Sequence, residues 1–300
     1  MKISFFLIFI LLQVLGLANK SSETETLFLD DMGRKLELKK TPLRIISLSP
    51  AITEMLFDLG IEDRIIGVSY YSNFPQAAQK KIKVGTYVNP LFEKIVALKP
   101  DLIIGTAEGL SQETGKKFDD LRLPLYVIFP KTIKDIPILY KKLGKLLGLE
   151  NIGVKKAETL SSEIRTFFNQ SEKCYPYTVF YLLELDPIMG VGRGSFIDDL
   201  LLNNNFKNVL SDIDKRYPVI SLEKFVKSDP DVLLVSVFNQ AEIKEFLKKY
   251  NYIRAIKNHQ VYFVNTDVFN RPGPRIVTAM NDLSSIRKKV EAFYKKRLVK

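Results

Sequence analysis

Short apolar stretches alternate with stretches of helical spacing along the first part of the chain. Each apolar stretch has four or five residues and is rich in isoleucine, leucine and valine, as buried strands are. We predict strands at 44–48, 65–68, 101–104 and 125–128, and helices at 53–60 and 91–98. Strands that alternate with helices in this way indicate a mostly parallel sheet with helices on its faces.

The pattern changes between 131 and 173, where about forty residues contain no strand candidate. We expect Gly148 and Gly153 to divide this stretch into two helices. The second, 154–172, has apolar residues on one helical face and would span about 30 Å, the diameter of a domain. Strand character returns at 178–183. The predicted fold is therefore α/β, with two Rossmann-like lobes that have mostly parallel sheets and are joined by a single long α-helix.

The second half of the chain repeats a segment of the first half. Residues 92–104 align without gaps with residues 222–234, and Glu, Lys, Val, Pro and Asp recur at a constant offset of 130. Each copy is predicted to be a short helix that ends before a proline and leads into a buried strand. A Pro-Asp junction is common by itself, but the matching Glu-Lys at the start of both helices favours two related lobes.

The N-terminus has the layout of a secretory signal peptide. One charge, Lys2, precedes an apolar run at 3–12, and the small residues Gly16 and Ala18 follow it. An uncleaved anchor helix is the alternative, but the run is shorter than the roughly 20 residues that a membrane span needs. We therefore expect export with cleavage near Ala18. The single cysteine, Cys174, does not follow this run, so we expect no lipid anchor.

Two strand-like stretches, 27–29 and 36–38, flank a turn and predict a β-hairpin ahead of the first lobe. The expected parts of the chain are a signal peptide (1–18), an N-terminal segment with the hairpin (19–43), an N-terminal α/β lobe (44–130), a helical linker (131–173), a C-terminal α/β lobe (174–286) and a basic tail (287–300). The tail has seven bases and one acid, and we expect a solvated helix end.

Composition excludes several kinds of chemistry. One cysteine cannot form an intrachain disulfide, and with His259 as the one histidine a His/Cys zinc site is not expected. No G-x-S-x-G elbow accompanies His259, which argues against a Ser-His-Asp hydrolase. The net charge of +11 permits an anionic partner without specifying one. Because an exported chain rarely meets nucleic acid, we expect no nucleic-acid partner.

Two acidic residues, Glu93 and Glu223, begin predicted helices at equivalent positions of the internal repeat. A carboxylate is favoured there by the helix dipole whatever the function, by about 0.3–1 kcal/mol. The alternative is that they are exposed acids, one on each lobe, that face a basic partner. The residues alone leave both interpretations open.

Aromatic and charged residues gather in loops that follow predicted strands, and ligands usually bind at this carboxyl edge of an α/β sheet. The tyrosines are Tyr70, Tyr71, Tyr87 and Tyr217. Their flat faces with hydroxyl rims suit a large amphipathic ligand, although each could be an ordinary partly buried tyrosine. Asp267, Arg271 and Arg275 surround a Pro-Gly-Pro segment, which would hold them at a cleft rim or in a surface salt bridge of little energy.

Eight segments together resemble the periplasmic substrate-binding proteins of ABC importers for iron-siderophores and cobalamin, the class with a helical backbone between the lobes. They lie in order along nearly the whole chain after the signal peptide, at 44–54, 66–68, 71–75, 84–85, 92–102, 194–196, 230–232 and 271–275. The resemblance is closest to the cobalamin-binding branch. It implies that 44–300 form one binding-protein domain in the periplasm, with the ligand held between two lobes.

The resemblance also implies roles for seven residues. In this family one glutamate on each lobe docks onto arginines of the membrane permease, and Glu93 and Glu223 match those positions. Five residues align with ligand-binding positions of cobalamin binders: Tyr71, Tyr87, Tyr217, Asp267 and Arg271. The chain has no tryptophan and carries Tyr87 and Tyr217 where cobalamin binders are expected to have tryptophan, which leaves the identity of the ligand open.

The function implied is capture of cobalamin, or of a related bulky metal chelate, and its delivery to an ABC-transporter permease with its ATPase. A ferric-siderophore or haem receptor on the same scaffold is the alternative. We expect a monomer with no catalytic residues, no metal site and no resident cofactor. The rivals are an exported α/β enzyme and a surface adhesin that uses the basic tail. Because a single helix joins the lobes, we expect only modest closure on ligand binding.

Overall fold

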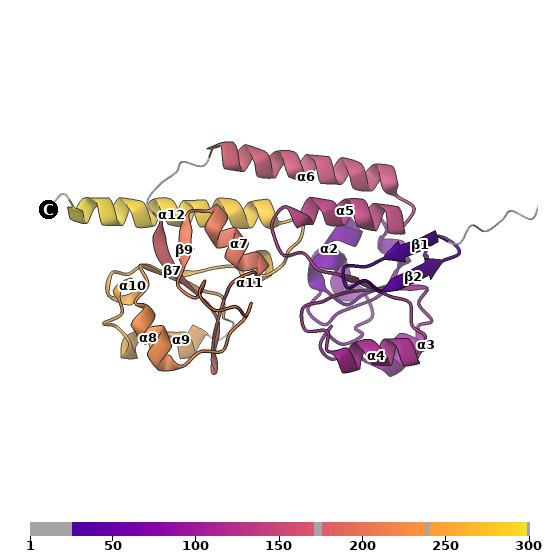
Figure 1. Cartoon of the computed structure of the whole chain (residues 1–300), viewed down its shortest axis with the longest axis horizontal. Coiled ribbons are helices and arrows are strands. Elements are labelled where there is room, and N and C mark those ends of the chain that lie inside the picture. The colour runs from indigo at the N-terminus through magenta and orange to yellow at the C-terminus, as the bar shows by residue number, and fades with distance from the viewer. Residues whose placement is uncertain (1–25, 171–175, 238–239, 299–300) are drawn as a thin grey trace, which may run out of the picture.

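Two lobes lie side by side in the computed structural model, and long helices run along one side of both (Figure 1). The structure describes residues 26–170, 176–237 and 240–298. The predicted signal peptide and Cys174 lie outside the described residues. None of the helices in these ranges combines the length and the apolar composition that a membrane span requires.

The N-terminal lobe contains a four-stranded, fully parallel sheet in the order β4-β3-β5-β6. Its strands are β3 (Ile45–Ser47), β4 (Ile65–Val68), β5 (Leu102–Thr106) and β6 (Leu125–Ile128). Its helices are α2 (Pro50–Asp58), α3 (Phe92–Ala97) and α4 (Gln112–Asp120), with 3₁₀ turns at Glu62–Arg64 and Gln76–Lys80. The strands are almost wholly buried and apolar, because helices cover both faces of a parallel sheet.

The C-terminal lobe repeats this plan. Its parallel strands lie in the order β9-β7-β10-β11, and β8 (Ile188–Gly190) adds an antiparallel pairing to β7. The parallel strands are β7 (Tyr177–Leu185), β9 (Phe206–Asn208), β10 (Val232–Val235) and β11 (Val261–Phe263). The helices are α7 (Phe196–Asn203), α8 (Leu222–Ser228), α9 (Gln240–Lys249), α10 (Arg254–Lys257) and α11 (Thr266–Phe269). In both sheets the first parallel strand of the lobe thus lies between the second and the third parallel strands. This shared order confirms the predicted fold class of two α/β lobes with mostly parallel sheets.

The segments that repeat in the sequence have the same conformation in the two lobes. Helix α3 leads into β5 in the way that α8 leads into β10. Both helices are followed by a residue with positive φ at the same offset of 130, Lys99 with a φ of 47° and Asp229 with a φ of 31°. A left-handed residue followed by a proline ends a helix sharply, so each copy turns directly into its strand.

The repeated aspartates explain why the Pro-Asp junction recurs. Asp101 accepts hydrogen bonds from the backbone N–H groups of Leu43 and Arg44, at 2.9 and 2.8 Å, just before β3 begins. Asp231 accepts from the backbone N–H of Thr178, at 2.9 Å, near the start of β7. In each lobe this carboxylate ties the central strand to the neighbouring β5 or β10.

The predicted hairpin is formed by β1 (Thr26–Leu29) and β2 (Lys35–Leu38), which pair antiparallel. Its turn is fixed to the edge strand β6, because the Val127 N–H donates to Asp30 Oδ2 at 3.0 Å and the Asp31 N–H donates to the Val127 carbonyl at 3.0 Å. The hairpin therefore covers one edge of the N-terminal sheet.

The connection between the lobes is made by α5 (Asp135–Leu146) and α6 (Glu150–Gln170), of which α6 is the long connecting helix. The predicted division into two helices is confirmed at 147–149, where Gly148 has a φ of 69°, but α6 begins at Glu150 and includes Gly153, four residues before the predicted start. A Cβ on Gly153 would lie 2.5 Å from the Tyr140 carbonyl oxygen and 2.8 Å from Gly144 Cα. Gly153 is thus needed for the close approach of α5 and α6 and not for a turn.

The last helix, α12 (Ile276–Leu298), runs beside α6 and continues without a break through position 287 (Figure 1). Buried side chains continue into the predicted basic tail. Arg287 is buried and pairs with Glu291 at 3.2 Å, and Tyr294 stacks on Tyr177 with ring centroids 5.3 Å apart. Within the described residues the tail is therefore the continuation of α12: its first part is packed against the C-terminal lobe, whereas Lys295, Lys296 and Arg297 are exposed, as predicted for a solvated helix end.

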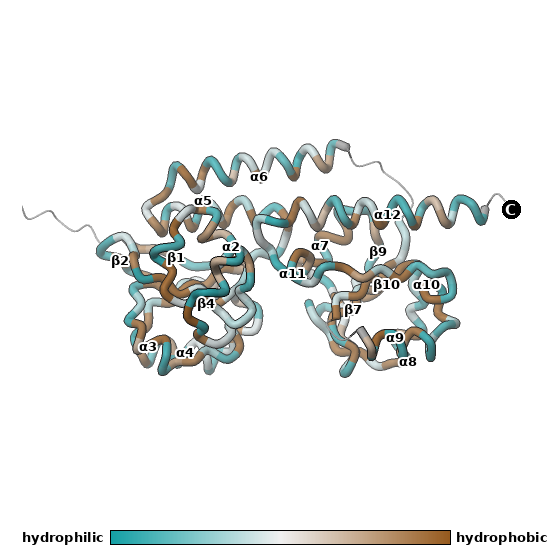
Figure 2. The backbone as a smooth tube through the Cα atoms, turned by 180° about the vertical axis from the view of Figure 1, so that it is seen from behind, coloured by the Kyte–Doolittle hydropathy of each residue, from teal (hydrophilic) through white to brown (hydrophobic). Residues whose placement is uncertain are grey.

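One continuous apolar core includes residues of both lobes together with α2, α5, α6, α7 and α12. Apolar positions concentrate in the strands, while α6 and α12 alternate between apolar and polar positions along their length (Figure 2). The lobes are consequently joined by packed side chains as well as by the chain itself. Such a joint is stiffer than a flexible linker.

Candidate functional site

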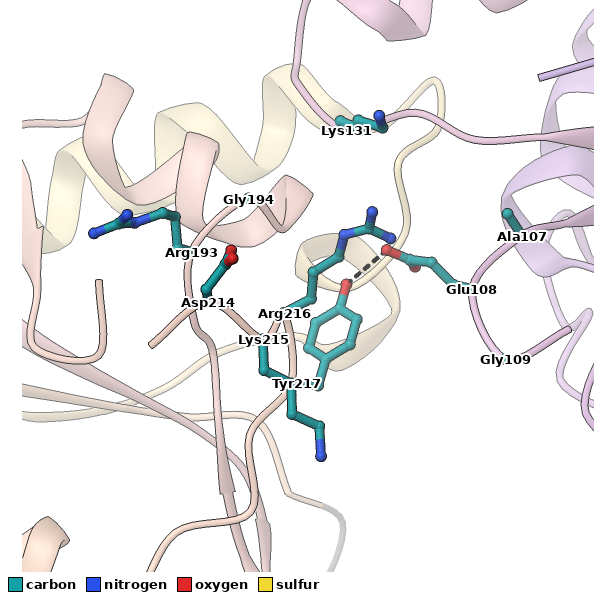
Figure 3. Close-up of a pocket in the computed structure, with 10 residues that line it drawn as sticks. All are labelled: Ala107, Glu108, Gly109, Lys131, Arg193, Gly194, Asp214, Lys215, Arg216 and Tyr217. Atoms are coloured by element: carbon teal, nitrogen blue, oxygen red, sulfur yellow. Dashed lines mark hydrogen bonds between the residues drawn. The ribbon is translucent and has the colours of Figure 1, made fainter. Parts of the chain in front are cut away.

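A pocket of about 630 Å³ lies between the lobes (Figure 3). Its lining comes from the loop after β5, from the chain before α5 and from two loops of the C-terminal lobe. The lining residues are Ala107, Glu108, Gly109, Lys131, Arg193, Gly194, Asp214, Lys215, Arg216 and Tyr217. The pocket faces the carboxyl ends of the β5 and β6 strands, where ligands bind in α/β sheets.

A hydrogen bond crosses this pocket from one lobe to the other. The Tyr217 hydroxyl donates to Glu108 Oε1 at 3.0 Å (Figure 3). Burial raises the pKa of Glu108, and the Tyr217 hydrogen bond and the Arg216 charge only partly oppose this effect. Burial also raises the pKa of Tyr217 well above its usual range, and the nearby Glu108 charge adds to the shift. Tyr217 is thus a neutral donor and Glu108 a carboxyl in a poorly hydrated place.

Tyr87 lies against the same loop. Gly109 has a φ of 81°, and a Cβ there would lie 2.6 Å from the Tyr87 ring, so the ring rests directly on the backbone of Gly109. Burial raises the pKa of Tyr87, with further contributions from Glu108 and Tyr71. Of the predicted ligand-binding tyrosines, Tyr217 therefore lines the pocket, Tyr87 lies against its Gly109, and Tyr71 is not among the lining residues.

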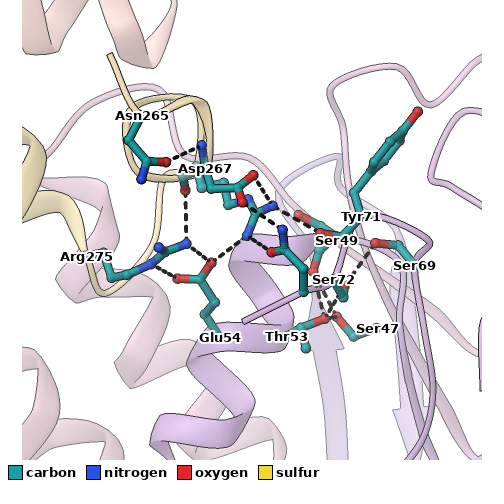
Figure 4. Close-up of polar contacts among 12 residues, drawn as sticks. Ser47, Ser49, Thr53, Glu54, Ser69, Tyr71, Ser72, Asn265, Asp267 and Arg275 are labelled. Atoms are coloured by element: carbon teal, nitrogen blue, oxygen red, sulfur yellow. Dashed lines mark hydrogen bonds and ion pairs between the residues drawn. The ribbon is translucent and has the colours of Figure 1, made fainter. Parts of the chain in front are cut away.

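Tyr71 has an exposed ring in a loop whose backbone accepts a hydrogen bond from Arg271 of the C-terminal lobe. Its side chain points away from the polar cluster that its backbone joins (Figure 4). It is 60% exposed, and the neighbouring Tyr70 and Phe74 are also exposed. Three exposed aromatic rings in one loop are unusual unless the surface has a partner.

Arg216 bridges the lobes beside the pocket. Its guanidinium lies 4.0 Å from the ring centroid of Phe129, a residue that follows β6 of the N-terminal lobe. The Lys131 ammonium approaches the same ring at 5.2 Å. A cation over an aromatic face contributes about 0.5–2 kcal/mol, depending on how far water is excluded.

Asp267 and Arg271 belong to a second cluster, which fixes the lobes to each other. Figure 4 shows Asp267, Glu54 and Arg275 of this cluster. Arg271 donates to Glu54 Oε1 at 3.0 Å, to Asn73 Oδ1 at 2.8 Å and to the Tyr71 carbonyl at 3.0 Å, and it pairs with Asp267 at 2.5 Å. Glu54 and Asn73 belong to the N-terminal lobe, so these contacts join residues about two hundred positions apart.

Arg275 completes this cluster, which we call the inter-lobe clamp (Glu54, Asn73, Asp267, Arg271 and Arg275). It donates to both carboxylate oxygens of Glu54, at 2.8 and 2.6 Å. The Glu54 side chain is 1% exposed and the Arg271 side chain 10%. The expected alternative of a surface salt bridge is therefore wrong, because the pairing partner is a buried carboxylate on α2.

A chain of buried hydroxyl groups holds the loop that carries Tyr71. Ser47 on β3 bonds Thr53 on α2 at 2.8 Å, Thr53 bonds Ser72 at 2.8 Å, and Ser72 bonds Ser69 at 2.9 Å (Figure 4). All four residues are buried. The segment from Ser47 to Glu54 thus positions the aromatic loop through its hydroxyl groups and the clamp through its carboxylate.

Glu93 and Glu223 lie in the first turns of α3 and α8, and both are exposed. Figures 1 and 2 show these helices at the same side of the molecule, one on each lobe and remote from α6. Glu223 pairs with Lys227 at 2.6 Å. The two glutamates are thus available to one partner that spans both lobes.

Sequence reasoning missed two residues. Glu108 lies in a short loop with no local motif, and Glu54 has its partners more than two hundred positions away. Within the described ranges there is no group of three or more His, Cys, Asp or Glu residues with the geometry to hold a metal ion.

Comparison with known proteins places this architecture in context. The family model for periplasmic binding proteins matches residues 45–268. A vitamin B12-binding protein of Vibrio parahaemolyticus is 29% identical over 240 residues, which cover 79% of this chain and 86% of that protein. An uncharacterized ABC transporter substrate-binding lipoprotein of Bacillus subtilis, YvrC, is 26% identical over 279 residues, 89% of this chain and 87% of that protein. The periplasmic vitamin B12 binding protein BtuF of Vibrio cholerae superposes with a TM-score of 0.76 at 27% identity, covering 84% of this chain and 98% of that one.

Proposed function

Because the chain belongs to the periplasmic binding protein family, we propose that it is the substrate-binding receptor of an ABC importer and that its cargo is cobalamin. The observation that carries the proposal is the pocket between the lobes, in which Tyr217 of one lobe meets Glu108 of the other beside the Tyr87 ring. Relatives with vitamin B12-binding names support the choice of cargo.

The proposed mechanism is capture and delivery without bond chemistry. Aromatic faces from both lobes cover the flat faces of a corrin, and hydroxyl, carboxyl and guanidinium groups at the ring edges meet its polar side groups. The inter-lobe clamp holds the two halves of the site at a nearly fixed separation. Closure on binding is therefore small, and the protein binds cargo as a monomer without a resident cofactor.

Delivery requires a second surface. We assign Glu93 and Glu223 to docking with a membrane permease that is coupled to an ATPase. Two exposed carboxylates, one on each lobe and on the same side of the molecule, match a partner with a basic site for each lobe. Charge pairs of this kind set orientation and association rate more than affinity. Export into the periplasm by the N-terminal segment brings the protein to that partner.

The cargo is tested by calorimetric titration of the purified protein with cyanocobalamin, with haemin and a ferric hydroxamate as competitors. We expect one-to-one binding of cyanocobalamin that neither competitor displaces at equal concentration. A response to haemin or the ferric chelate alone would keep the fold and change the cargo. No response to any of the three would return the exported enzyme to consideration.

One observation favours the second candidate, a receptor for an acidic chelate such as haem or a ferric siderophore. The pocket lining has four cations, Lys131, Arg193, Lys215 and Arg216, against the carboxylates of Glu108 and Asp214. Three of the cations are exposed, so water and salt screen their charges. For this reason we rank cobalamin first.

Docking is tested with Glu93→Ala and Glu223→Ala together. Uptake by cells should fall about tenfold or more, while cyanocobalamin affinity stays the same, because the glutamates lie outside the pocket. Glu113→Ala with Glu245→Ala removes one exposed acid from each lobe and should leave uptake unchanged. A parallel loss of affinity in the first pair would place the glutamates in ligand binding and refute the docking assignment.

A further inference from the structure

The carboxyl of Glu108 occupies an unusual position for an acidic group. It follows β5 at the carboxyl edge of the N-terminal sheet and points across the pocket toward Tyr217 and Arg216 (Figure 3). Glu108 is half-buried, and burial is the largest influence on its pKa. The donor that the structure shows for this carboxyl is the Tyr217 hydroxyl. A carboxylate has room for several donors, so a neutral phenol leaves most of its accepting capacity unused.

The charged groups around the pocket differ in how strongly they act on a ligand. Lys131, Arg193 and Lys215 are exposed at the rim, and Arg193 also donates to the Ser211 carbonyl at 2.8 Å. Exposed charges are screened by water and salt over about 8–10 Å. Glu108 lies farther from water, where one charge acts more strongly on a contacting group. Among the charged residues of the lining, Glu108 and Arg216 are the two that are half-buried, so their charges act most strongly on a ligand within the pocket.

We propose that Glu108 is a specificity-determining residue that selects corrin ligands with primary amide side groups and rejects ligands with carboxylates at the same position. This inference rests on the proposed cobalamin receptor. Amide N–H₂ groups donate hydrogen bonds, so they satisfy the free acceptor positions of Glu108. A ligand carboxylate brings no donor and a like charge. Polar groups placed for a donor discriminate strongly against an analogue that lacks it, because they are then left unpaired.

The neighbours of Glu108 fit this role. Tyr217 and the ligand amide can donate to the carboxyl together, since each of its two oxygens accepts more than one hydrogen bond. The positive charge of Arg216 lowers the electrostatic cost of the half-buried Glu108 carboxylate. The Arg216 guanidinium lies 4.0 Å from the Phe129 ring centroid, and this contact keeps it from closing the pocket. Rejection of acidic ligands therefore depends on the charge of Glu108, while Tyr217 orients the carboxyl.

The test uses ligands that differ by one group. Mild hydrolysis of cyanocobalamin gives the b-, d- and e-monocarboxylic acids, in each of which one amide is replaced by a carboxylate. We expect the wild-type protein to bind cyanocobalamin and to bind at least one of the three acids about tenfold or more weakly. In Glu108→Gln the affinity for that acid should come within about threefold of the affinity for cyanocobalamin. The uncharged glutamine amide does not repel the acid and can donate a hydrogen bond to it.

Two further variants separate charge from structure. Tyr217→Phe keeps the carboxylate, so the penalty against the same acid should remain. Glu113→Gln changes an exposed acid on α4 outside the pocket and should bind every ligand as the wild type does. Calorimetry gives the affinities, and thermal melting of each variant checks that it is folded.

The possible outcomes distinguish the two proposals. Equal binding of all three acids and cyanocobalamin by the wild type refutes the role of Glu108 and leaves the cobalamin receptor intact. A penalty that persists in Glu108→Gln refutes it in the same way, because another group would be its source. Binding of haemin in place of cyanocobalamin by the wild type overturns the proposed cargo and the selection of amides with it.

Discussion

Two carboxylates of the N-terminal lobe, Glu54 and Glu108, reach partners on the C-terminal lobe, and their surroundings differ in kind. Glu54 is 1% exposed and receives three hydrogen bonds from two arginines. Glu108 is half-buried in the pocket and receives one from the Tyr217 hydroxyl. Both join the lobes, but only Glu54 has its charge matched by a direct ion pair.

The difference separates the part of the molecule that holds the lobes from the part that holds the ligand. A buried carboxylate with paired cations is a permanent structural contact, since any opening would leave charges unpaired. A carboxylate with one neutral donor can accept further hydrogen bonds. It loses only one hydrogen bond when the contact between the lobes rearranges.

The largest effect is expected at the inter-lobe clamp. Glu54→Ala leaves Arg271 and Arg275 without their shared carboxylate, and removal of one partner from a buried ion pair costs roughly 3–5 kcal/mol. Denaturant unfolding measures the loss. We also expect the transition to become less cooperative, because the lobes lose a contact through which they stabilise each other.

A surface ion pair provides the control for this substitution. Lys116 and Asp120 pair at 3.0 Å on α4, with side chains 77% and 61% exposed. Asp120→Ala should cost less than about 0.5 kcal/mol, because exposed pairs contribute little. If Glu54→Ala costs no more than Asp120→Ala, the clamp does not hold the lobes and the comparison fails.

The strands of the fold could be predicted closely because buried parallel strands are short continuous apolar runs. The predictions at 65–68 and 125–128 coincide with β4 and β6. The helical linker was predicted less well, since a glycine that allows two helices to approach has the same local signal as one that ends a helix. At Gly153 the contact with Gly144 decides, and that contact is tertiary.

The site could be predicted only in part. Tyr217 and Tyr87 follow from the rule that loops at the carboxyl edge meet ligands; Tyr217 lines the pocket, and the Tyr87 ring lies against Gly109 of the lining. Glu108 lies in such a loop too, but its importance comes from Tyr217 across the cleft. Arg271 was assigned to the ligand through family resemblance, whereas its donors in the structure are directed at Glu54, Asn73 and Tyr71. Its contact with ligand stays a prediction.

A smaller effect is expected from Tyr217→Phe, which removes the hydroxyl that donates to Glu108 and preserves the ring. The carboxyl then loses its donor in a poorly hydrated place, which should cost about 1–2 kcal/mol of stability. Denaturant unfolding without ligand measures this cost. Tyr262→Phe is the matched control, because its hydroxyl donates to Gln260 at 2.9 Å, away from the pocket. Equal losses in the two variants would show that Glu108 has no special need of Tyr217.

The smallest effect concerns the pH dependence of stability. Burial raises the pKa of Glu108 above its ordinary value of 4.5, so the folded protein keeps this proton at pH values where the unfolded chain has released it. The stability that this group contributes is fully present below pH 4.5 and is lost as the pH rises through the folded-state pKa.

The variant Glu108→Gln cannot ionise at this position. Its unfolding free energy should therefore match that of the wild type near pH 4 and exceed it at pH 8, by less than about 1 kcal/mol because Tyr217 and Arg216 offset part of the burial. Unfolding curves at the two pH values measure this difference, and a variant that gains nothing at pH 8 would mean that the Glu108 carboxylate is as well accommodated as that of Glu54.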